Sequence, residues 1–299
     1  MPAILSDPAE SARRRATLIG FGAVLLWATL ALFAAASGNV PPLQLNAMAF
    51  LIGGSLGLVM MAQRGTTRTV LAQPLRVIAF GTIGLFGFHF LFFTAMRNAP
   101  PVEASLINYT WPLLIVVFSA LLPGERLGWH HVAGALIGLA GTAILVTGGE
   151  GPAGGGTALG YLAACGSALF WSSYSVLSRR FGHVPTDTVT LFCLSTAALS
   201  AVCHFAFETT VWPDTATEWL AVLALGLGPV GGAFFLWDHG VKSGDIQVLG
   251  ASAYAAPLLS TLLLIAFGFG ALTWPVALAC VAITGGAVLA AKDLLFRKH

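Results

Sequence analysis

Charged residues are scarce in this chain. Asp, Glu, Lys and Arg make up 9% of its 299 residues, whereas soluble domains carry about 25%. Hydrophobic residues reach 57%, and the mean hydropathy is +0.85. A soluble fold of this length could not bury so much apolar surface, so the composition predicts a polytopic membrane protein embedded in a lipid bilayer.

Other absences narrow the function. The net charge is only +2, which argues against a nucleic-acid partner. The four cysteines lie in apolar runs without a Cys-x-x-Cys spacing, so we expect small hydrophobic residues rather than disulfides or metal ligands. Neither a Gly-x-x-x-x-Gly-Lys-Ser/Thr nor a His-Glu-x-x-His pattern occurs. We therefore expect no direct use of ATP, no cofactor, no metal and no enzymatic activity.

Apolar runs of about 20 residues, long enough to cross a bilayer, occur ten times along the chain. The predicted spans are 16–36, 43–62, 75–97, 102–122, 129–148, 157–179, 186–207, 219–241, 246–267 and 274–292. The expected fold is all-α with ten transmembrane helices. The predicted parts are a cytoplasmic tail 1–15, a five-helix unit 16–148, a Gly-rich linker 149–156, a second five-helix unit 157–292 and a cytoplasmic tail 293–299.

Lys and Arg are distributed unevenly across these spans. Thirteen of the 14 basic residues fall on one side, and only Arg97 falls on the other. Since basic residues accumulate on the cytoplasmic side, both termini are predicted to be cytoplasmic and the acidic loop 208–218 external. The N-terminus does not look like a signal peptide, and we expect a bacterial-type inner membrane.

The two halves match each other at a nearly constant spacing of 144 or 145 positions. Gly-Ala-Val-Leu-Leu-Trp at 22–27 recurs as Gly-Ser-Ala-Leu-Phe-Trp at 166–171, Tyr109 and Pro112 recur as Tyr254 and Pro257, and Arg97 recurs as Lys242. Each half has five predicted spans, so the second half must enter the membrane inverted. Inverted repeats are typical of secondary transporters, whose substrate site lies near the midplane between the repeats.

A proline interrupts the fourth predicted span at its middle. Pro112 has no backbone N–H, so it leaves the Asn108 carbonyl without its usual helical partner. Lipid tolerates such a break only where protein or a water-filled cavity covers it. The break favours a helix that lines a transport pathway, and the alternative is a kinked packing helix. In later spans, Pro257 marks a similar kink that should leave the Ala253 carbonyl free, and Pro229 marks a possible hinge.

Aromatic residues near the span centres are the candidate wall of a cavity. Such rings could stack on an aromatic substrate and attract its ammonium group, although core packing explains them equally well. His89 lies within an aromatic run and could bind substrate or carry a proton, or simply pack. The candidate substrate-binding residues are Trp27, His89, Asn108, Tyr109, Trp111, Trp171, Tyr174, Trp237 and Tyr254, and the candidate hinge or kink residues are Pro112, Pro229 and Pro257.

Two further patterns predict local contacts. Asp238 and Lys242 are four residues apart, which favours an ion pair on a helix surface. Gly-xxx-Gly pairs at Gly53, Gly134 and Gly228 predict close helix packing inside the molecule. None of these pairs argues for a dimer, so we expect a monomer or a weak homodimer.

Two short motifs add a family resemblance. Ile-Asn-Tyr-Thr-Trp-Pro at 107–112 and Leu-Phe-Trp-Ser-Ser-Tyr at 169–174 resemble those of the aromatic amino-acid exporters in the EamA-type branch of the drug/metabolite transporter superfamily. The resemblance covers about 16–292. It implies ten helices around a central cavity, alternating-access export of aromatic amino acids or related metabolites from the cytoplasm, and a substrate path lined by Trp111 and Trp171.

Two alternatives remain open at this point. A carrier of a sugar nucleotide or phosphate ester would need Lys or Arg at mid-depth, where this sequence predicts none. An intramembrane lipid-modifying enzyme would need a nucleophile and base or a metal cluster.

Overall fold

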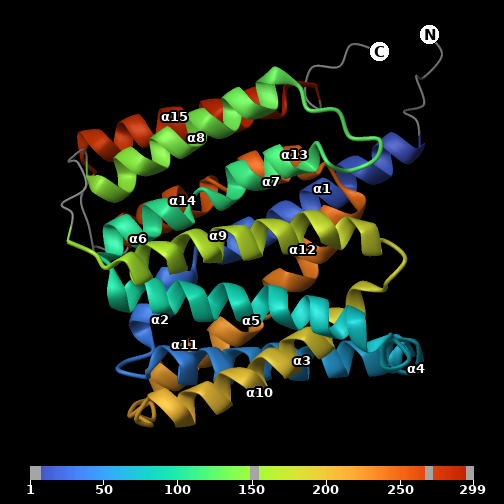
Figure 1. The fold of residues 1–299 in the computed structure, drawn as a ribbon, viewed down its shortest axis with the longest axis vertical. Coiled ribbons are helices and arrows are strands. Elements are labelled where there is room, and N and C mark those ends of the chain that lie inside the picture. Colours follow the sequence, from blue (N-terminus) through green and yellow to red (C-terminus); the bar gives the residue numbers. More distant parts are fainter. Residues whose placement is uncertain (1–7, 149–154, 267–271, 294–299) are drawn as a thin grey trace.

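The computed structural model describes residues 8–148, 155–266 and 272–293, and all regular structure in these ranges is helical (Figure 1). The helices are α1 (Pro8–Trp27), α2 (Leu30–Ala36), α3 (Pro42–Gln63), α4 (Thr67–Leu71), α5 (Leu75–Asn98), α6 (Pro101–Asn108), α7 (Trp111–Ser119), α8 (Trp129–Thr147), α9 (Ala158–Ser178), η1 (Arg179–Phe181), η2 (Thr186–Thr188), α10 (Val189–Phe207), α11 (Ala216–Leu227), α12 (Gly232–Ser243), α13 (Ile246–Ser252), α14 (Ala255–Ala266) and α15 (Trp274–Ala290).

Among the described residues, seven helical segments are long and apolar enough to cross a membrane. They are Pro8–Ala36, Pro42–Gln63, Leu75–Asn98, Trp129–Thr147, Thr186–Phe207, Ala216–Ser243 and Ile246–Leu263, and the shorter Trp274–Ala290 is also apolar. The structure thus confirms an all-helical protein with several membrane spans.

The first helix begins earlier than the sequence predicted. Residues 8–15, expected to be part of a tail, form the first turns of α1. Their Ala, Glu and Arg residues favour helix, and Arg13 is held by ion pairs to Glu125 and Asp245. The remainder of the predicted tail, residues 1–7, lies outside the described residues, as does most of the predicted linker.

Four predicted spans are each divided into two helices. The divisions fall at 28–29, 109–110, 228–231 and 253–254. Pro112 lies in the first turn of α7, where its missing N–H leaves no helical bond unmade. The break therefore precedes the proline rather than coinciding with it. In the ninth predicted span the Ala253 carbonyl accepts a hydrogen bond from the Ala256 amide at 3.0 Å, so the expectation that this carbonyl is free was wrong.

The helices pack in pairs. α8 packs against α15 along one flank of the bundle, α3 packs against α10 along the opposite flank, and α1 with α12 and α5 with α9 lie between them (Figure 1). Glycines permit the closest approaches: a Cβ on Gly134 would overlap the Gly286 carbonyl, and a Cβ on Gly53 would overlap the Gly231 backbone. These contacts confirm that the Gly53 and Gly134 patterns serve packing within the molecule.

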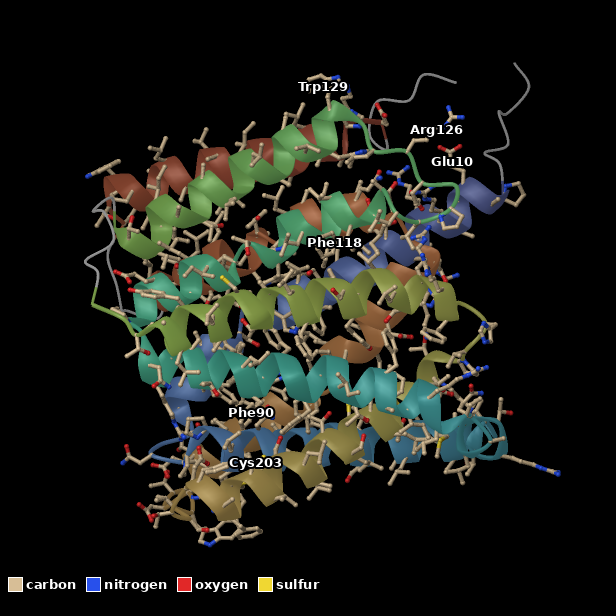
Figure 2. The ribbon with its side chains drawn as sticks, viewed as in Figure 1. Glu10, Phe90, Phe118, Arg126, Trp129 and Cys203 are labelled. Atoms are coloured by element: carbon tan, nitrogen blue, oxygen red, sulfur yellow. The ribbon has the colours of Figure 1, made fainter. Side chains whose placement is uncertain are left out.

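The two ends of the bundle differ in charge. One end, here called the basic end, holds the start of α1, helix α4 and the α9–α10 and α12–α13 connections, and lies on the right in Figure 1. Glu10 and Arg126 lie at this end (Figure 2). Glu125 is paired there with Arg13 at 3.2 Å and with Arg179 at 2.6 Å. The opposite end, here called the mouth end, holds the α2–α3 connection and the ends of α5 and α10.

Candidate substrate cavity

A cavity of about 610 Å³ lies inside the bundle. Its walls come from α2, α3 and α5, from the α6–α7 and α11–α12 breaks, and from α14. The lining is mostly apolar, and within the described part of the chain it includes no Asp, Glu, Lys or Arg. Its residues are Trp27, Leu30, Ala31, Ala34, Ser37, Gly38, Val40, Pro42, Leu45, Asn46, Ala49, Phe88, His89, Phe92, Phe93, Met96, Asn108, Tyr109, Trp111, Trp171, Leu225, Pro229, Val230, Phe234, Ala256, Pro257 and Ser260.

Three tryptophans, Trp27, Trp111 and Trp171, form the inner end of this cavity, here called the tryptophan floor. Trp27 lies at its centre, with ring centroids 6.0 Å from Trp111, 5.7 Å from Trp171 and 5.0 Å from Trp237. Trp237 is fully buried beneath the others, and its indole N–H donates to the Ser175 hydroxyl at 3.0 Å. Edge-to-face contacts of this kind stabilise a fixed arrangement of rings, so the floor is a preformed aromatic surface.

His89 lies in the wall above this floor. Its ring contacts Phe50 and Phe88 edge to face at 5.0 and 4.9 Å. Its Nδ1 lies 2.7 Å from the Leu85 carbonyl oxygen. Because a carbonyl can only accept, Nδ1 carries a hydrogen, and Nε2 is the nitrogen left for other partners.

Amide side chains supply polarity in the same region. Asn108 Oδ1 accepts a hydrogen bond from the Ser167 hydroxyl at 2.8 Å, which leaves the amide N–H groups of Asn108 for other acceptors. On the opposite wall, Asn46 Nδ2 donates to the Ser200 hydroxyl at 2.8 Å. The cavity therefore combines large apolar rings with a few oriented polar groups, as small-molecule sites do.

The cavity opens at the mouth end and is closed at the basic end. Its outermost lining residues, Gly38 and Pro42, are exposed. Below the floor, Trp237 and Tyr174 are buried, and Phe80 stacks on Tyr174 at 5.4 Å. As far as the described residues extend, the cavity is thus accessible from the mouth end and blocked at the basic end.

The site residues predicted from the sequence divide into three groups. The structure brings Trp27, His89, Asn108, Tyr109, Trp111, Trp171, Pro229 and Pro257 together at the cavity. Tyr174 and Trp237 lie just beneath the floor. Tyr254 and Pro112 lie away from it, since the Tyr254 hydroxyl accepts from the Leu113 amide at 3.2 Å and the Pro112 carbonyl faces Gly250.

Several cavity residues were missed by sequence reasoning. Phe88, Phe92, Phe93 and Phe234 all line the wall. Phenylalanine is frequent throughout the spans, so its presence alone does not separate a cavity face from a lipid face. The sequence signal that could have identified this wall was the four-residue spacing of Phe88 and Phe92. Their rings stack at 6.1 Å beside His89.

Comparison with known proteins identifies the family. The EamA-like transporter family matches the chain twice, over residues 14–147 and 158–291. The chain belongs to this family. The matched segments include every element that lines the cavity, so the EamA-like fold builds the tryptophan floor from both of its matched segments.

Individual EamA-like relatives are similar over most of their length. An Ancylobacter novellus protein named aromatic amino acid exporter YddG is 56% identical over 284 residues, covering 93% of this chain and 97% of the relative. A Salmonella typhimurium protein of the same name is 26% identical over 84% of this chain and 87% of its own. A solved crystal structure aligns with a TM-score of 0.88 at 55% identity, covering 96% of this chain and all of the other.

Proposed function

We propose that this protein is a secondary transporter that exports aromatic amino acids from the cytoplasm by alternating access. The observation that carries the proposal is the tryptophan floor at the closed end of a 610 Å³ cavity. Indole rings offer flat apolar faces to an aromatic side chain and attract a nearby ammonium group. The names of the EamA-like relatives support the same substrate class.

The proposed architecture is ten transmembrane helices in two inverted five-helix repeats, at 16–148 and 157–292. The pairing of helices supports it. Under this scheme α1 corresponds to α9 and α5 to α12, so the observed packing of α1 on α12 corresponds to that of α5 on α9. The flanking pairs, α3 with α10 and α8 with α15, each join an element to its own counterpart.

The proposed orientation places the basic end and both termini in the cytoplasm of a bacterial-type inner membrane. The excess of Lys and Arg at this end supports that orientation. The cavity then opens to the outside, and the described structure is the outward-facing state. The proposed unit is a monomer or weak homodimer, and the packing of Gly53 and Gly134 within the chain supports it.

The cavity disfavours the alternative substrates. A phosphate ester would need cationic partners, and the lining residues of the described chain include neither Lys nor Arg.

Flux measurement tests the proposed function. Purified protein in liposomes should release loaded phenylalanine, tyrosine and tryptophan unchanged, and faster than protein-free liposomes do. Glucose 6-phosphate serves as the control solute and should stay inside. Release equal to that of empty liposomes, or release of a chemically altered product, would contradict the proposal.

A further inference from the structure

A buried ion pair lies directly beneath the tryptophan floor. Lys242 Nζ is 2.8 Å from Asp238 Oδ2, and their side chains are 6% and 1% exposed. The sequence spacing correctly predicted the pair but wrongly placed it on a helix surface. Thr186 donates to the same carboxylate at 2.8 Å, and Lys242 also donates to the Val184 carbonyl at 3.1 Å. We call these four residues the inner polar cluster.

Within the described residues, the open cavity does not provide charged partners for the two charged groups of an amino acid. A free amino acid carries an ammonium and a carboxylate, and moving either from water into an apolar site without a charged partner is costly. The cavity lining described above holds no fully charged side chain. Charged side chains that could pair with the ammonium and carboxylate must therefore come from elsewhere along the substrate path.

The repeat spacing relates the inner polar cluster to the open cavity. The residues 145 positions before Asp238 and Val241 are Phe93 and Met96, and both line the cavity. The residues 144 positions before Val184 and Thr186 are Val40 and Pro42, which also line it. The counterparts of Asp238, Val184 and Thr186 thus form part of the cavity wall in the first repeat, and the counterpart of Lys242, Arg97, lies next to the lining residue Met96.

On the basis of the transport function above, we propose that Asp238 and Lys242 bind the charged headgroup of the amino acid in the state open to the cytoplasm. If the two repeats exchange conformations, the inner polar cluster becomes the wall of the inward-facing cavity. Asp238 then accepts the substrate ammonium, and Lys242 donates to its carboxylate.

The closed pair explains how this site remains stable when it is empty. Asp238 and Lys242 satisfy each other, so neither charge is buried without a partner. The substrate headgroup replaces one ion pair by two. On the outer side, the counterpart of Asp238 is Phe93, which lines the cavity and offers no charge. The counterpart of Lys242 is Arg97, which is outside the cavity lining and is already paired with Glu208. Recognition of the headgroup is thereby confined to the side from which an exporter loads its substrate.

Competition in everted membrane vesicles, whose cytoplasmic face is outward, tests this assignment. Initial uptake of labelled phenylalanine is measured in the presence of one of three unlabelled competitors. They are phenylalanine itself, 3-phenylpropionate, which lacks the ammonium, and 2-phenylethylamine, which lacks the carboxylate. Wild-type protein should prefer phenylalanine over either analogue by about tenfold or more. Wild-type vesicles that accumulate no phenylalanine would refute the transport function itself.

The decisive variant is the double substitution D238N/K242Q, which removes both charges while keeping polar groups of similar size. It should reduce the preference for phenylalanine to about twofold or less over both analogues. The matched control is R64Q/D187N, because Arg64 and Asp187 form a 2.6 Å pair at the same end whose counterparts at the 144-residue spacing, Glu208 and Leu43, do not line the cavity. An unchanged preference in D238N/K242Q would overturn the assignment.

Single substitutions separate the role of Asp238, which binds the ammonium, from that of Lys242, which binds the carboxylate. They also provide the test if the double variant takes up too little substrate to measure. D238N should weaken discrimination against 3-phenylpropionate only, and K242Q against 2-phenylethylamine only. Equal effects on both analogues would show a structural ion pair and contradict the assignment.

Discussion

At the scale of single residues, the tryptophans found from sequence lie where the proposed chemistry needs them. Trp111 and Trp171 are 6.2 Å apart and nearly perpendicular, and each is also in contact with Trp27. Their mid-span positions were visible in the sequence because indole rings otherwise prefer the membrane interface. Their mutual edge-to-face geometry was not, since it depends on helices distant in the chain.

Trp171→Ala should lower export of phenylalanine, tyrosine and tryptophan about 2- to 10-fold, because a lost aromatic contact is worth roughly 0.5–1.5 kcal/mol. Transport per inserted molecule in proteoliposomes is the measurement. Trp274→Ala is the matched control, since Trp274 is 66% exposed and outside the cavity. Equal rates in both variants would make Trp171 a packing residue.

The tyrosines show the limit of residue-level prediction. Tyr109 and Tyr254 occupy equivalent repeat positions, yet only Tyr109 lines the cavity. Tyr254 packs against Gly138 and bonds to the Leu113 amide. Both faces of these spans are apolar, so sequence periodicity could not show which ring faces the cavity.

Tyr254→Phe should therefore leave transport within about twofold of the wild-type rate while lowering stability by about 1 kcal/mol, the usual net value of one hydrogen bond. Thermal unfolding in detergent, paired with flux, checks both effects. A stable but inactive variant would place Tyr254 in the transport mechanism.

Glu208, at the mouth end, couples stability to pH. Burial opposes ionisation, but hydrogen bonds from His204 and from the Leu43 and Gln44 amides, together with Arg97 at 2.5 Å, hold the pKa of Glu208 below its ordinary value. A lowered folded-state pKa contributes stability above the unfolded value of about 4.3, and that stability is lost as the pH falls through the folded value.

Acidification of the mouth-end face below about pH 4.3 should accordingly lower the unfolding temperature. Glu208→Gln should lower stability at neutral pH and reduce this acid dependence. Identical pH profiles of unfolding temperature in wild type and variant would show that Glu208 does not contribute. Asp214→Asn serves as the control for a general effect of removing one acidic residue from the same loop.

At the scale of elements, the helices were predicted more accurately than their interruptions. Hydrophobic length located the spans, and proline marked the spans that break. The breaks at 109–110 and 253–254 nevertheless precede Pro112 and Pro257 by two or three residues, because a proline is well tolerated in the first turn of the following helix. The 28–29 break contains neither proline nor glycine, so no local sequence signal marked it.

Helix pairing at the α8–α15 flank depends on close backbone approach. Gly134→Ala should destabilise the protein by about 1–3 kcal/mol, because its Cβ meets the Gly286 carbonyl and the α15 backbone. Gly285→Ala is the matched control, since a Cβ there meets nothing within 4 Å. The unfolding temperature in detergent is the readout. Equal stability of the two variants would contradict the packing described here.

At the scale of the whole molecule, the membrane class and overall helical build followed from composition and span length. The position of the cavity could not be deduced from composition and span length. It forms where elements from both matched segments meet and where four spans are broken. The same arrangement leaves the molecule open at the mouth end and closed by ion pairs at the basic end.

The central claim is that an aromatic amino acid binds in this cavity from the mouth end. Ser260 lines the cavity on α14, so S260C on a cysteine-free background places a thiol inside it. A membrane-impermeant thiol reagent applied from the outside should label this position, and saturating tryptophan should slow labelling severalfold while glycine has no effect. Labelling only from the cytoplasmic side, or labelling indifferent to tryptophan, would contradict the account.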